Sequence, residues 1–153
     1  MQTASRYPWG KGTPRWVRDA TADDSDKSFT VPAGKIWQVL QIYMHLTATA
    51  AVGDRRPAIE ISNGVANIWT GVLGVASASQ LAVIEANQTH GSVTTTIRQP
   101  ITGGANNTNN TAMIPLPTMF LPAGYIIRCW DSAAIAAATD DTVVILHYIE
   151  YDA

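Results

Sequence analysis

A Pro-Ala-Gly step occurs twice in this chain, and an apolar run follows each copy. Residues 31–34 read Val-Pro-Ala-Gly, and residues 121–124 read Leu-Pro-Ala-Gly. Proline fixes φ at about −65° and glycine accepts positive φ, so the step favours a tight turn that ends one strand and starts the next. Two such turns, in a chain without a strong helical period, predict an antiparallel β-protein.

The apolar run after the first turn alternates as a strand does. From residue 36 to residue 46 the even positions are apolar except for Gln38, whereas the odd positions mix apolar and polar side chains. Period two predicts a strand whose even positions, Leu40 among them, face the core. Residues 58–62 alternate as well and end at Asn63-Gly64, a hairpin signal. We expect further strands at residues 66–73, 80–86 and 92–98.

The run at residues 142–151 is apolar on both faces. A strand of this kind lies inside a sheet and is covered twice, by its own core and by another layer or subunit. Taken together, the strands predict an all-β fold, a jelly-roll-like antiparallel β-sandwich.

The beginning of the chain has a different character. Pro8, Gly10, Gly12 and Pro14 exclude a long helix there. We therefore expect an extended N-terminal arm over residues 1–27 and a single β-sandwich domain over residues 28–153.

Charge is scarce in this sequence. Charged residues make up 14% of the chain, and the formal net charge is −2, whereas soluble domains have about 25% charged residues. A surface so poor in charge is typical of proteins packed against partners, and the slight negative charge argues against direct nucleic-acid binding. No apolar run is long enough to span a membrane, and the first residues lack a secretory signal, so we expect no membrane partner and synthesis in the cytoplasm.

The pattern of reactive residues predicts no enzyme, cofactor or metal site. His45, His90 and His147 lack the close spacing of metal ligands, and the lone Cys129 lies in an apolar run where a buried thiol is expected. The acidic stretch at residues 23–26 lacks the glycine and glutamate that a calcium loop requires. Glutamates of separate strands could face one another, but no nucleophile elbow or phosphate loop accompanies them.

Arginines and aromatic residues alternate in the arm, and such residues dominate binding energy at interfaces. Exposed tryptophans are costly in water, so we expect them to be docked on a partner, the alternative being that they fold back and cap their own sandwich. The candidate partner-binding set is Arg6, Tyr7, Trp9, Lys11, Arg15, Trp16 and Arg18.

Five segments carry a resemblance to a known family, namely residues 31–40, residues 52–56, Ile-Pro-Leu-Pro at 114–117, Leu-Pro-Ala-Gly at 121–124 and the acidic-aromatic end Glu150-Tyr151. In these segments the chain resembles a group of small virion proteins of tailed bacteriophages. The resemblance covers residues 28–151 and leaves the arm without a counterpart. It implies a capsid decoration or cement protein on the capsid exterior of the virion. Its implied partners are the major capsid protein and further copies of itself, as a homo-trimer or homo-dimer, and it carries over no functional residues.

A second hypothesis is a carbohydrate- or receptor-binding β-sandwich module of a head fibre or tail, because jelly-roll sandwiches also serve as lectins. A lectin site needs an aromatic platform beside Asn or Asp. Residues 106–110 supply Asn and Thr without an aromatic residue, which favours the structural reading.

Overall fold

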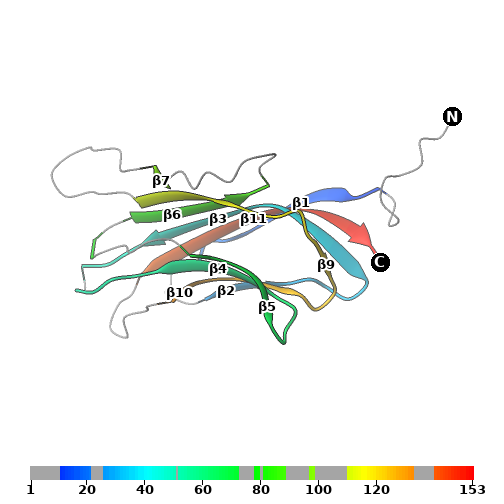
Figure 1. Cartoon of the computed structure of the whole chain (residues 1–153), viewed down its shortest axis with the longest axis horizontal. Coiled ribbons are helices and arrows are strands. Elements are labelled where there is room, and N and C mark those ends of the chain that lie inside the picture. Colours follow the sequence, from blue (N-terminus) through cyan, green and yellow to red (C-terminus); the bar gives the residue numbers. More distant parts are fainter. Residues whose placement is uncertain are drawn as a thin grey trace.

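The computed structural model describes residues 11–21, 26–50, 52–72, 78–79, 81–88, 97–98, 110–132 and 140–153. Their regular structure is β-strand, arranged in two stacked sheets (Figure 1). The larger sheet, sheet A, has the order β1-β11-β3-β6-β8-β7, with β9 paired to β3, and the smaller, sheet B, has the order β2-β10-β4-β5. The strands of sheet A are β1 (Thr13–Asp19), β3 (Lys35–Thr47), β6 (Leu81–Asn87), β7 (Ile97–Arg98), β8 (Asn110–Pro115), β9 (Phe120–Pro122) and β11 (Asp141–Asp152). Those of sheet B are β2 (Lys27–Thr30), β4 (Pro57–Ser62), β5 (Asn67–Val72) and β10 (Ile126–Asp131).

The two Pro-Ala-Gly turns carry the chain between the sheets. The first leads from β2 in sheet B to β3 in sheet A, and the second leads from β9 in sheet A to β10 in sheet B. Gly34 has φ +72° and Gly124 has φ +85°, values that L-residues with a Cβ rarely adopt. The turns also bond to each other, because Val31 donates its N–H to Tyr125 O and accepts from Gly124 N at 2.9 Å each. The repeated step is therefore a paired crossover at one end of the sandwich.

The core lies between the sheets and is continuous along the molecule. Inward side chains of β3, β6 and β11 meet those of β4 and β10, with Trp37 packed on Tyr148 at a ring-centroid distance of 4.1 Å. Among the described residues, the largest fully buried apolar side chains are Val31, Ile42, Met44, Leu46, Ile59, Ile61, Ile84, Leu121, Ile127 and Leu146. Burying them supplies the main driving force for stacking the sheets.

The predicted core face of the first long strand is correct for only half of its length. In the pairing of β3 with β11, His147 lies opposite Gln41 but Tyr148 lies opposite Val39, so Leu40 is an extra residue. Such a bulge reverses which positions face inward. Ile42, Met44 and Leu46 point to the core as predicted, whereas Trp37 and Val39 replace Leu40 on the other side of the bulge.

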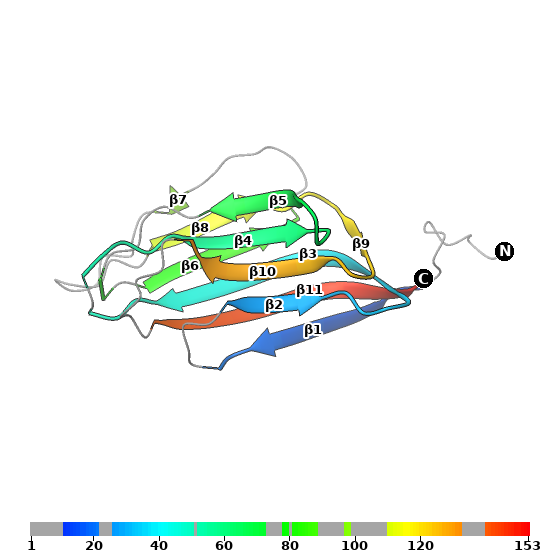
Figure 2. The same ribbon diagram turned by 90° about the horizontal axis from the view of Figure 1, so that it is seen from below.

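The predicted arm is partly a strand of the sandwich. Residues 13–19 form β1, which pairs antiparallel with β11 from Thr13↔Glu150 to Asp19↔Val144. Figure 2 shows β1 at the outer edge of sheet A, beyond β11. Lys27 opens β2, is buried, and donates from Nζ to Thr21 O at 3.1 Å. The predicted boundary at residue 28 thus lies inside the sheet-forming part of the chain, and residues 1–10 lie outside the described residues.

The prediction of an all-β, antiparallel-rich β-sandwich is confirmed, and the jelly-roll subtype stays a prediction. β5 and β6 match the strands expected at residues 66–73 and 80–86, and the β4–β5 hairpin turns at Gly64 with φ +84°. Of the strand expected at 92–98, residues 97–98 are described, as β7. Among the described strand pairs, one departs from the antiparallel pattern, since β6 and β8 run parallel.

Candidate binding surface

The outer face of sheet A carries rows of side chains that cross three to five strands. One row runs through residues paired in register, namely Trp16, His147, Gln41 and Asn87. The next row contains Arg18, Ile145, Tyr43, Glu85 and Met113. A third contains Val143, His45 and Val83. Paired residues share a face, so these three rows form one surface, here called the outer face of sheet A.

This outer face is rich in apolar side chains that are not fully covered. Ile145, Tyr43, Val83 and Val143 are half-buried. Trp16 at its edge is 69% exposed, a large area for a tryptophan to leave in water. An open depression of about 220 Å³ lies among Gln41, Tyr43, Ile145 and His147. Exposed apolar surface that is contiguous in this way marks an interaction site more often than single exposed residues do.

Hydrogen bonds fix the polar side chains of this face. Gln41 Nε2 donates to Glu85 Oε1 at 2.7 Å, and Asn87 Nδ2 donates to the same oxygen at 3.2 Å. Asn87 Oδ1 is buried and has no hydrogen-bond partner within the part of the chain that the structure describes. The Glu85 carboxylate and the amides of Gln41 and Asn87 therefore form a fixed polar margin beside the apolar depression.

Two of the three histidines lie on the outer face, in separate rows. His147 pairs with Gln41 and His45 pairs with Val143, which places the two imidazoles in different rows. Partial burial lowers the pKa of His45 below its ordinary value, because the charged form loses hydration. His90 lies outside the described residues. Among the residues that are described, no three His, Cys, Asp or Glu side chains gather as metal ligands would.

The predicted partner-binding residues are spread along the first segment. Trp16 and Arg18 of β1 project onto the outer face of sheet A, whereas Arg15 projects to its other side, where Nε lies 3.7 Å from Glu150 Oε1. Lys11 is exposed just before β1. The remaining members, Arg6, Tyr7 and Trp9, lie outside the described residues. The structure therefore places Arg15, Trp16 and Arg18 in an edge strand of the sandwich, where all three side chains are exposed.

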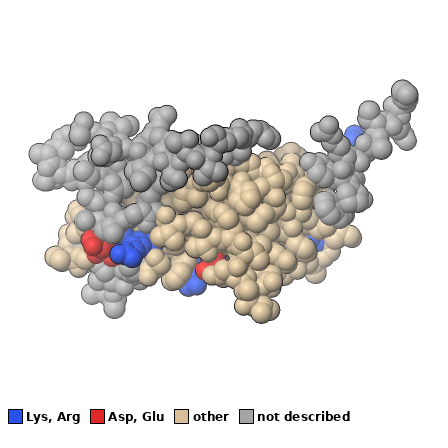
Figure 3. All heavy atoms as spheres, viewed as in Figure 1, with Lys and Arg blue, Asp and Glu red and all other residues tan. Residues whose placement is uncertain are grey.

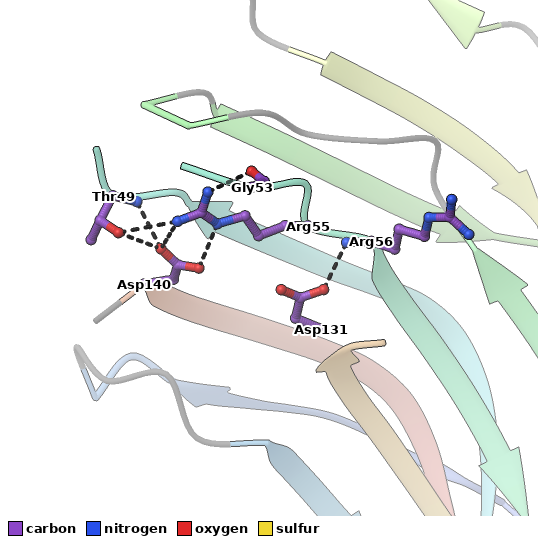
Figure 4. Close-up of polar contacts among 6 residues, drawn as sticks. All are labelled: Thr49, Gly53, Arg55, Arg56, Asp131 and Asp140. Atoms are coloured by element: carbon purple, nitrogen blue, oxygen red, sulfur yellow. Dashed lines mark hydrogen bonds and ion pairs between the residues drawn. The ribbon is translucent and has the colours of Figure 1, made fainter. Parts of the chain in front are cut away.

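Arg55 and Asp140 form a buried ion pair (Figure 4). The pair lies between the end of β3 and the start of β11, at the end of the sandwich opposite the Pro-Ala-Gly turns (Figure 2). Arg55 is fully buried and holds Asp140 with two bonds, from Nε to Oδ2 at 2.9 Å and from Nη2 to Oδ1 at 3.1 Å. Its Nη1 donates to Gly53 O at 2.8 Å, and Thr49 donates from its N–H and hydroxyl to Asp140 Oδ1 at 2.7 and 2.9 Å. Burial alone would raise the pKa of Asp140, but the bonds from Arg55 and Thr49 outweigh it and hold the pKa below its ordinary value. This cluster ties the β3–β4 connection to the start of β11.

The glutamates that could have faced one another lie on separate surfaces. Glu60 lies in sheet B, in register with Arg128. Glu85 is on the outer face of sheet A, and Glu150 accepts from Trp37 Nε1 at 3.2 Å on the inward side of β11. Cys129 is fully buried, and burial raises the pKa of its thiol far above the ordinary range. No helix in the described residues is long and apolar enough to cross a membrane.

The low charge of the sequence is visible on the surface. Figure 3 shows one side of the molecule, whose described part is mostly uncharged, with acidic side chains lying next to basic ones. An example of such pairing is Lys35, whose Nζ lies 2.6 Å from Asp152 Oδ1. Pairing of this kind leaves much of the described surface without net charge.

Two features of the site were not assigned from the sequence. The first is the outer face of sheet A. The run at residues 142–151 is apolar on both faces and indicated a covered surface, yet the sequence does not show which strands lie beside this run. The Arg55–Asp140 pair spans residues far apart in the chain, and its one signal is the Gly-Asp-Arg-Arg run at 53–56 in a chain with few charges. Compared with known proteins, the chain matches no family model, and no curated protein matches it significantly.

Proposed function

We propose that this chain is a structural virion protein, a decoration or cement subunit that binds the outside of an assembled phage shell and stabilises it. The observation that carries the proposal is the outer face of sheet A, with its apolar rows, its open depression and an exposed tryptophan. Such a face stabilises a complex when a partner covers it. The resemblance of residues 28–151 to phage virion proteins supplies the kind of partner, which is the major capsid protein.

The mechanism is burial of surface across neighbouring capsid subunits. A rigid sandwich presents the outer face as a preformed patch, so little conformational entropy is lost on docking. The scarcity of charge lowers the cost of removing water from the contact. A subunit docked on two capsid proteins at once holds them together against internal pressure.

The test is binding of the purified protein to shells that lack it, with bound copies per shell as the readout. Ile145→Asp places a charge in the middle of the outer face and is expected to reduce binding strongly. Ile68→Asp is the matched control, because Ile68 is 44% exposed on β5 of the other sheet. Equal binding by the two variants would contradict the proposed surface, and failure of the unaltered protein to bind any shell would contradict the function.

A second candidate is a carbohydrate- or receptor-binding module. The observation in its favour is Trp16, whose exposed ring lies in register with His147 and Gln41, an aromatic platform beside hydrogen-bonding groups. A glycan array separates the two candidates. Binding of a sugar that is lost in Trp16→Ala, with no binding to shells, would favour this module over a cement subunit.

A further inference from the structure

Among the described strands, β1 is the last of sheet A, and one of its two sides is unpaired. Within the described residues it pairs with β11 alone. Pro14 lies opposite Ile149 and cannot donate a hydrogen bond, so residue 14 must direct its nitrogen away from β11. Backbone groups alternate along a strand, so Trp16 and Arg18 direct their N–H and C=O groups outward as well. The free edge thus offers two donors and three acceptors to another strand.

The side chains of this strand are arranged symmetrically about Val17. Arg15 and Asp19 lie two positions to either side of it, and Trp16 and Arg18 lie one position to either side. When two copies of the strand run antiparallel with Val17 opposite Val17, Arg15 of one lies opposite Asp19 of the other. In the same register Trp16 lies opposite Arg18, which brings a guanidinium against an indole ring. Each of these contacts occurs twice, because the arrangement is two-fold symmetric.

This register also matches the directions of the backbone N–H and C=O groups along β1. Residues 16 and 18 are the outward-directed ones, and placing them opposite each other lets each pair exchange two N–H···O bonds. Pro14 falls opposite Ala20 near the end of the paired segment, where its missing donor removes one bond on each side.

Edge strands are often protected from pairing by proline and by charges of one sign. Here the edge has Pro14 at its margin, and its charges are of opposite sign and self-complementary. We therefore propose that two copies of this chain associate through β1, joining their larger sheets into one continuous sheet across a two-fold axis.

This dimer would cover the most exposed large apolar side chain among the described residues of sheet A. Trp16 is 69% exposed in the single chain, and Arg18 beside it is exposed too. The outer faces of the two sheets would then lie side by side as one double-width surface. Dimerisation is independent of the proposed function, since it needs no shell and is measured without one.

The experiment uses the full chain and three samples in sedimentation. In a dimer of Arg15→Asp, both copies of the contact place the new aspartate opposite Asp19, and in a dimer of Asp19→Arg both place the new arginine opposite Arg15. Because like charges then face each other, each variant alone is expected to dimerise at least about tenfold more weakly than the unaltered chain. In an equimolar mixture of the two variants both contacts pair opposite charges again, so a heterodimer is expected. The intrachain contacts of residues 15 and 19 are the same before and after mixing, so restored association reports the interface alone.

A second variant guards against loss of folding. Trp16→Ser leaves the inward contacts of β1 in place and is expected to weaken the dimer while the melting temperature of the monomer is kept. Protection of the Arg15 and Val17 amides in hydrogen exchange confirms that β1 is formed in every variant. A monomeric unaltered chain throughout the micromolar range, a trimer, or a mixture that stays monomeric would each overturn the proposal.

Discussion

Arg55 shows how much one residue can determine in a chain with few charges. Its guanidinium is fully buried and its partner Asp140 is nearly so, so each charge depends on the other in place of water. Breaking such a pair costs about 3–5 kcal/mol, because it leaves an uncompensated buried charge. We expect Asp140→Asn and Arg55→Met each to lower the free energy of unfolding by that amount in denaturant titrations.

The matched control is the neighbouring arginine. Arg56 is exposed, and its backbone bonds lie outside the Arg55–Asp140 cluster. Its N–H donates to Asp131 Oδ1 at 2.7 Å (Figure 4), and its carbonyl accepts from the N–H and the hydroxyl of Ser132 at 2.9 Å each. Arg56→Ala is therefore expected to stay within about 0.5 kcal/mol of the unaltered protein. Similar losses at both arginines would show that the buried pair is not what holds this end together.

His45 predicts a pH dependence whose sign is defined. Its folded-state pKa is lowered by burial, so the unfolded chain takes up a proton at higher pH than the folded chain does. The contribution of neutral His45 to stability is complete above its ordinary pKa of about 6.5 and is lost as the pH falls through the lowered value. In thermal melts from neutral to mildly acid pH, His45→Gln should lose stability less steeply than the unaltered protein. Parallel curves would contradict this.

At the scale of elements, the paired turns depend on two glycines in the left-handed region. A Cβ on Gly34 or Gly124 would meet no atom within 4 Å, so the cost of substitution is backbone strain alone. Gly34→Val and Gly124→Val are expected to lower the free energy of unfolding by about 1–2 kcal/mol. Gly34→Asn is expected to cost less, because asparagine tolerates positive φ. Equal losses for valine and asparagine would point to a steric cause instead.

The strands and turns could be predicted from the sequence more fully than the order of the strands within each sheet. The repeated Pro-Ala-Gly step, the alternation at 36–46 and the Asn63-Gly64 turn each correspond to a strand or turn in the structure. The bulge at Leu40 was not predictable, because it becomes evident only from the pairing with β11, where His147 lies opposite Gln41 but Tyr148 lies opposite Val39. The same reason applies to β1, since a Pro- and Gly-containing segment reads as an arm until its pairing with β11 is known. Of the binding surface, Trp16 and Arg18 were identified from residue type, whereas Tyr43 and Ile145 required the register of three strands.

At the scale of the whole molecule, β1 is part of the stability of the sandwich. Removing residues 1–10 keeps every described strand. Removing residues 1–19 deletes β1 together with Val17, which packs against the core, and uncovers the edge of β11. We expect the shorter truncation to melt like the full chain if residues 1–10 act only in docking. The longer one should lose about 2 kcal/mol or more of unfolding free energy and tend to aggregate through the new edge. Identical melting of the two truncations would contradict a structural role for β1.

The pairing of β3 with β11 has a consequence for biosynthesis. β11 lies between β1 and β3 and joins them, although its residues are made long after theirs. A nascent chain stalled before residue 141 lacks β11. In such a chain β1 has neither the strand that it pairs with nor the strand that links it to β3. The β3-β6-β8 part of the larger sheet can pair earlier, but β1 can join it only after β11 has emerged from the ribosome. Pairings between such distant segments are slow to form. A cell making many copies would hold a pool of unfinished sheets with open edges, and recruitment of a chaperone during translation would shorten that exposure.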